Sequence, residues 1–175
     1  MINFASKERF KLIHVLFYSF AFLFLILECG FFYRFSFFSV KPNLILLLVT
    51  FYIFYFSFRI GHVVAFCLFC GLLKDMMSGV APGTHVLVLV CLGILLRYLA
   101  KRFLRYNWVF IIFLFVAATF LHAVLYFVVQ RCLFSAYVAS WWTVVRIAMI
   151  ELVYGLFLFG LFFRIIKQCV IDKLS

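Results

Sequence analysis

The segment KDMMSGVAPGTH, from Lys74 to His85, interrupts a sequence that is otherwise strongly apolar. It places a Lys-Asp pair, a proline and two glycines between two hydrophobic runs. Glycine and proline favour tight turns, and the run on either side is long enough to form a helix. We therefore predict a helical hairpin that turns within this segment, with Thr84 as the N-cap of its second helix.

The composition indicates that the solvent of this chain is a lipid bilayer. Hydrophobic residues make up 70% of its 175 residues, against roughly 45–50% in soluble domains. Six helical spans of about 20 residues would use about 120 residues, which leaves short loops and no room for a separate soluble domain. The apolar runs are continuous rather than alternating, which favours helices over a β-barrel. We expect an all-α membrane protein, a six-transmembrane-helix bundle forming a single domain over residues 1–175. The expected spans are residues 12–32, 43–58, 60–77, 84–100, 108–130 and 141–163.

The apolar run from Asn43 to Leu73 is too long for one straight span. As a single helix its roughly 31 residues would extend about 46 Å, against a hydrocarbon core of about 30 Å. Arg59, Gly61 and His62 interrupt its middle. Two shorter helices joined by a tight turn are therefore predicted, and the first is expected to begin at Pro42-Asn43.

The basic residues predict the orientation of the bundle. The densest cluster follows the fourth span and contains Arg97, Lys101, Arg102 and Arg105. The positive-inside rule places both this cluster and the basic N-terminal segment in the cytoplasm. That requires an even number of intervening spans, which only the division of the long run provides. We expect both termini to be cytoplasmic, the first run to be a retained span rather than a cleaved signal peptide, and Trp108, Trp141 and Trp142 to lie at the membrane interfaces.

Several other classes of function find no support. The net charge of +11 comes from basic clusters beside apolar runs, which indicates contact with anionic lipid headgroups rather than with nucleic acid. No hydrolase, zinc-protease or phosphate-binding motif is present, so we expect no enzymatic activity and no cofactor. Cys67 and Cys70 form a CxxC without a second ligand pair, which argues against a metal site. Cys29 and Cys132 would both lie near the outer face, and a disulfide between them is left open.

Asp75 is the first candidate functional residue, because a carboxylate at a membrane boundary normally has a partner. The alternative is an Asp that simply faces solvent at a helix end. Its neighbours Ser78, Gly79 and Gly83 belong to the turn, and His85 is placed to face Asp75 across it. We expect these five residues to form a structural site or a partner interface.

Glu151 is the second candidate, since it lies near the middle of the sixth predicted span. His122 in the fifth span has a compatible depth, and we predict an interhelical contact between the two. Arg146 lies about 140° away around the same helix and hence on another face. A proton relay is less favoured, because a single carboxylate lacks a ladder of partners.

The segment from Lys41 to Phe103 resembles the rod shape-determining protein MreD family. The shared pattern is a Pro-Asn opening an apolar run, a basic-Gly turn, G-x-x-x-D-x-x-S-G-x-x-x-G and a later basic pair. In this sequence the pattern corresponds to Pro42-Asn43, Arg59-Ile60-Gly61, Gly71, Asp75, Ser78, Gly79, Gly83 and Lys101-Arg102. The first-loop residue before the proline is Lys41, where the family usually has Arg.

This resemblance implies a non-enzymatic scaffold subunit of the bacterial cell-elongation machinery, which builds peptidoglycan and sets rod shape, in the inner membrane. It also implies a fold similar to the substrate-binding subunits (S-components) of energy-coupling-factor transporters. The implied partner is MreC, and through it MreB, RodZ, and RodA with its transpeptidase. The competing interpretation is a membrane subunit that binds a small solute for uptake. Such a subunit would use Asp75, His85, His122, Arg146 and Glu151.

Overall fold

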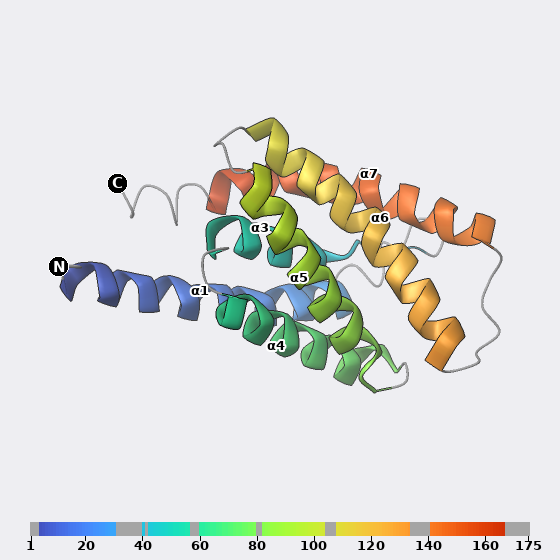
Figure 1. Ribbon diagram of the computed structural model, residues 1–175, viewed down its shortest axis with the longest axis horizontal. Coiled ribbons are helices and arrows are strands. Elements are labelled where there is room, and N and C mark those ends of the chain that lie inside the picture. Colours follow the sequence, from blue (N-terminus) through green and yellow to red (C-terminus); the bar gives the residue numbers. More distant parts are fainter. Residues whose placement is uncertain are drawn as a thin grey trace.

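Six helices form the regular structure of the residues that the computed structural model describes, which are 4–30, 40, 42–56, 60–79, 82–103, 108–133 and 141–166. They are α1 (Phe4–Cys29), α3 (Leu44–Phe56), α4 (Ile60–Ser78), α5 (Thr84–Phe103), α6 (Trp108–Leu133) and α7 (Trp141–Ile166) (Figure 1). Each predicted span corresponds to one helix, so the all-helical prediction is confirmed.

The division of the long apolar run into two helices is also confirmed. α3 ends at Phe56 and α4 begins at Ile60, where one continuous helix was the alternative. The predicted turn residue Arg59 lies outside the described residues. Some helix ends differ from the predicted spans, since α1 begins earlier, at Phe4, and α7 continues to Ile166, whereas α3 is shorter than its predicted span 43–58. A helix can continue past the apolar run that limits a span.

Four helices are long and apolar enough to cross a membrane, and these are α4, α5, α6 and α7. The described apolar part of α1, Ile13–Cys29, and α3 are shorter. With 13 residues, α3 extends about 20 Å, less than the hydrocarbon core of about 30 Å. The chain is thus a multi-pass helical membrane protein by length and composition, and six crossings remain a prediction.

α3 forms the centre of the bundle and contacts each of the other helices. All of its side chains from Leu44 to Phe54 are buried, as expected for a helix that is apolar on every side. Aromatic rings join it to its neighbours. Tyr52 stacks on Phe66 of α4 with ring centroids 4.0 Å apart, and Phe51 stacks on Phe159 of α7 at 5.0 Å.

Successive helices run in opposite directions, so the start of α1 and the end of α7 lie at the same end of the bundle (Figure 1). The connection between α4 and α5 lies at the opposite end, where α7 begins with exposed Trp141 and Trp142. This arrangement agrees with the predicted parity of the spans. The basic residues Arg34, Lys41, Arg105, Lys167 and Lys173 lie outside the described residues, so the cytoplasmic position of the termini remains a prediction.

Candidate functional site

The carboxylate of Asp75, near the end of α4, caps the beginning of α5. Its Oδ1 accepts a hydrogen bond from the backbone N–H of His85 at 2.9 Å. Its Oδ2 accepts from the N–H groups of Gly83 at 2.9 Å and Val86 at 3.3 Å. The first N–H groups of a helix have no partner within the helix, and a negative charge there also interacts favourably with the helix dipole. Asp75 therefore fixes α5 against α4.

The glycines of the motif make this hairpin possible. Gly79 and Gly83 have φ angles of 62° and 91°, which side chains with a Cβ rarely adopt. Gly71 allows a close approach of α4 and α5, because a Cβ on it would lie 2.5 Å from the Cα of Val86. Ser78 is the last residue of α4 and is exposed. Gly71, Asp75, Ser78, Gly79 and Gly83 thus lie in one compact helical hairpin.

His85 contacts Asp75 through its backbone N–H, and its imidazole ring faces α6 instead. The imidazole stacks on the ring of Tyr126 in α6 at 5.3 Å between centroids. It is buried, and its Nδ1 has no hydrogen-bond partner. Thr84, the predicted N-cap, is instead the first residue of α5 and is fully buried, so the cap position falls on Gly83.

Lys74 lies at the centre of a polar cluster that sequence analysis did not predict. Its Nζ donates to Oδ1 of Asn43 at 2.7 Å and forms an ion pair with Oε1 of Glu28 at 3.1 Å. Both charged side chains of the pair are only 12% exposed. Asn43 precedes α3, and its Oδ1 also accepts from the N–H of Leu46 at 3.1 Å, so it caps α3 at the start that the Pro42-Asn43 pattern predicted.

Glu151 on α7 joins this cluster and does not pair with His122. Its carboxyl group is buried, has the Asn43 side chain within hydrogen-bonding reach and interacts electrostatically with Lys74 and Glu28. Neither ring nitrogen of His122 has a hydrogen-bond partner. No hydrogen bond therefore joins His122 to Glu151, and the predicted contact between the two side chains stays a prediction.

His122 instead lies alongside Tyr126 on its own helix, with ring centroids 6.2 Å apart, and interacts electrostatically with Lys74 and His85. Arg146, which the uptake interpretation included, is exposed, consistent with its predicted position on another face of α7 from Glu151. We call the following residues the Lys74 cluster: Glu28, Asn43, Lys74, His85, His122 and Glu151.

Three members of the cluster, Glu28, Asn43 and Lys74, were not predicted as site residues. The available signal was an isolated acidic residue near the end of the first apolar run and a lysine at the end of the third. In a bundle of alternating helices, both ends fall on the same side. Their similar depth is compatible with the ion pair between Glu28 and Lys74, but depth alone does not fix which helix faces meet.

The cysteines show no sign of redox or metal chemistry within the described part of the chain. Cys67 and Cys70 are buried, and Cys29 and Cys132 are exposed, and all four are free thiols. Among the described residues, no three His, Cys, Asp or Glu side chains are grouped closely enough to hold a metal ion. Cys169 lies outside those residues.

A second polar contact joins α1, α3 and α4 away from the Lys74 cluster. The hydroxyl of Tyr52 lies 2.9 Å from Nδ1 of His14 and donates to the backbone oxygen of His62 at 3.4 Å. The rings of His14 and His62 stack at 4.9 Å between centroids. These contacts tie the three helices together.

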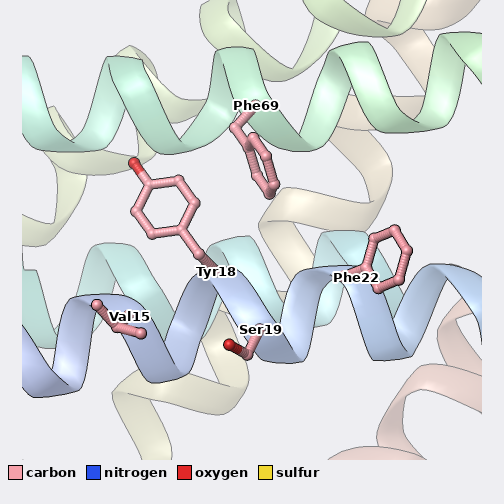
Figure 2. A pocket seen from close by; sticks show the side chains of 5 residues that line it. All are labelled: Val15, Tyr18, Ser19, Phe22 and Phe69. Atoms are coloured by element: carbon pink, nitrogen blue, oxygen red, sulfur yellow. The ribbon is translucent and has the colours of Figure 1, made fainter.

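A shallow apolar groove of about 510 Å³ lies on the outside of the bundle between α1 and α4. Figure 2 shows Tyr18 of α1 and Phe69 of α4 directed toward each other across it, with ring centroids 4.9 Å apart. Val15, Ser19 and Phe22 line the α1 side. Such a surface suits a lipid chain or an apolar helix and offers no reactive group.

No family model matches the chain, and neither a curated protein nor a solved structure is significantly similar to it. Its function is therefore inferred from its own residues and from the resemblance of the segment Lys41 to Phe103.

Proposed function

We propose that this protein is a non-enzymatic scaffold subunit of the bacterial cell-elongation machinery in the inner membrane, acting in peptidoglycan synthesis and rod shape. It binds an MreC-type partner through the bilayer, and through that partner MreB, RodZ, RodA and the transpeptidase. The fold proposed for it is a bundle of six crossings, similar to the S-components of energy-coupling-factor transporters, with both termini in the cytoplasm.

The observation that carries this proposal is the use of the motif residues in one hairpin. Gly71 brings α4 and α5 together, Asp75 caps α5, and Gly79 and Gly83 form the turn. These residues contact backbone and solvent rather than a reaction centre. A motif used to build a rigid surface supports a binding role.

The hairpin carries an exposed apolar surface suited to a partner. Met76 and Met77 follow Asp75 directly and are 82% and 57% exposed. Methionine is flexible and polarisable and adapts to irregular partner surfaces. By fixing the end of α4, Asp75 fixes the position of both methionines.

Co-purification tests this role. The Asp75→Ala variant and a Met76→Ser/Met77→Ser variant should each recover much less MreC homologue from native membranes than the wild type does. Arg146→Gln on α7 is the control and should bind normally. If Asp75→Ala retains both partner binding and rod shape, the hairpin is not the docking element.

The second candidate function is that of a solute-binding subunit of an uptake transporter. It is favoured by one observation, the buried polar groups without hydrogen-bond partners in His85 and His122. Gene neighbourhood separates the two functions. Genes for MreC and MreB homologues beside this one favour the scaffold, and genes for transporter ATPases favour uptake.

A further inference from the structure

We infer that the first turns of α7 form a binding site for the headgroup of an anionic phospholipid, with Arg146 and Trp142 as its contact residues. This inference goes beyond the scaffold function and requires only that α7 crosses the membrane. It rests on the order of exposed side chains along one face of α7, on the depth of Arg146, and on the lack of a counter-ion for Arg146 among the described residues.

Exposed side chains recur at every third or fourth position along α7, a spacing that places them on one face of the helix. In chain order they are Trp142, Arg146, Met149, Val153 and Phe157. From the beginning of α7, this face thus presents an indole, a guanidinium group and then apolar side chains. A phospholipid presents its headgroup and its acyl chains in the same order, so the whole face matches one lipid molecule.

The position of Arg146 along α7 places its charge within reach of the headgroups. It lies five residues after Trp141, which corresponds to about 7.5 Å along the helix axis. Trp141 and Trp142 are both exposed at the beginning of α7, and tryptophan prefers the membrane interface. Because the Cα–Cβ bonds of a helix tilt toward its N-terminus, a long side chain at position 146 can extend back toward the tryptophans with its methylene groups in contact with lipid.

Arg146 has no counter-ion within the described part of the chain, where it forms no ion pair. Glu28 is paired with Lys74, and the carboxylate of Asp75 accepts three backbone N–H groups of α5. Glu151 is buried, on another face of α7. A guanidinium group that faces lipid without a carboxylate from its own protein is costly, and an anionic headgroup removes this cost.

The chemistry of the two contact residues selects the headgroup. A guanidinium group donates two parallel hydrogen bonds to a phosphate, and the indole N–H of Trp142, one turn nearer the beginning of α7, supplies a further donor. Both residues only donate, so the ligand must accept hydrogen bonds and carry negative charge. Phosphatidylglycerol fits, because its phosphate has no cation in the same headgroup. In phosphatidylcholine, a quaternary ammonium group already neutralises the phosphate.

Quenching of Trp142 fluorescence by brominated lipids tests the inference. The chain has three tryptophans, so Trp108→Phe/Trp141→Phe leaves Trp142 as the single fluorophore. This parent is reconstituted into phosphatidylcholine vesicles that contain increasing fractions of brominated phosphatidylglycerol or brominated phosphatidylcholine. We expect phosphatidylglycerol to bind beside Trp142 about fivefold more tightly than phosphatidylcholine. Arg146→Gln should reduce this preference to about one, and Arg146→Lys, which keeps the charge but loses the paired hydrogen bonds, should reduce it partly.

Arg131→Gln is the matched control, because Arg131 is also exposed and lies in the last turn of α6 at the same end of the bundle. It removes the same charge and should keep the fivefold preference. If the single-tryptophan parent does not fold, native mass spectrometry of the wild type from mixed vesicles replaces quenching. The wild type and Arg131→Gln should then retain phosphatidylglycerol, and Arg146→Gln should lose it.

Three results would overturn the inference. The first is equal binding of the two lipids by the parent, which would favour a carboxylate of a partner helix as the counter-ion of Arg146. The second is a preference that survives Arg146→Gln. The third is an equal loss in Arg131→Gln, which would show a general effect of net charge at this end of the bundle.

Discussion

Replacing Asp75 should destabilise the α4–α5 hairpin by an amount that its hydrogen bonds allow us to estimate. Hydrogen bonds to a charged group contribute about 1.5–3 kcal/mol each. Three N–H groups donate to Asp75, but Gly83 is exposed and its N–H can bond to water instead. The two partly buried donors, His85 and Val86, remain. At the lower value for each, Asp75→Ala should lower the free energy of unfolding by about 3 kcal/mol. Asp75→Asn should cost about half as much, since one oxygen remains to accept.

Denaturant unfolding in detergent micelles measures this loss, with Lys101→Gln at the other end of α5 as a control expected to change stability by less than about 0.5 kcal/mol. Amide hydrogen exchange locates it. Exchange at His85 and Val86 should accelerate strongly in Asp75→Ala, and exchange in α7 should change only with global stability. Unchanged protection at both amides would refute the capping role, whatever the global stability.

Other substitutions test the remaining contacts. Lys74→Met leaves buried carboxyl groups without their counter-charge and should lower the free energy of unfolding by about 3–5 kcal/mol. In denaturant unfolding, combining Lys74→Met with Glu28→Gln should recover part of this stability. If the two changes are strictly additive, the side chains do not interact. Gly71→Ala forces a Cβ against the Val86 backbone and should cost about 1–3 kcal/mol in the same assay, whereas Gly160→Ala, with open space around it, should stabilise the protein by up to about 1 kcal/mol. Reporter fusions should place both termini in the cytoplasm, and activity of either fusion on the outer side would refute the six-span layout.

The helices and the hairpin could be predicted from the sequence because each depends on residues that are close together in the chain. The length of the apolar run from Asn43 to Leu73 exceeds one span, and the interruption near Gly61 marks the division that α3 and α4 confirm. The hairpin could also be predicted, because Asp75 is only about ten residues from the backbone N–H groups at the start of α5 to which it binds. Turn chemistry and helix capping depend on such short separations.

The Lys74 cluster could not be predicted in the same way, because it depends on which helices become neighbours. Glu151 and His122 have compatible depths, yet Asn43 and Lys74 occupy the space near Glu151. Depth restricts position along the membrane normal and leaves the rotation of each helix undetermined. Apolar residues on every side of α3 and α6 gave no amphipathic pattern to fix that rotation.

The enclosure of α3 has a consequence for how this protein is made. α3 leaves the ribosome before α5, α6 and α7, which later surround it. Until they arrive, the mostly apolar surface of α3 can rest in lipid. Its polar groups Thr50 and Tyr52 do not depend on these later helices, because the Thr50 hydroxyl bonds to the backbone of Leu46 and the Tyr52 hydroxyl contacts α1 and α4. We therefore expect α3 to insert into the membrane before it packs laterally against α5, α6 and α7.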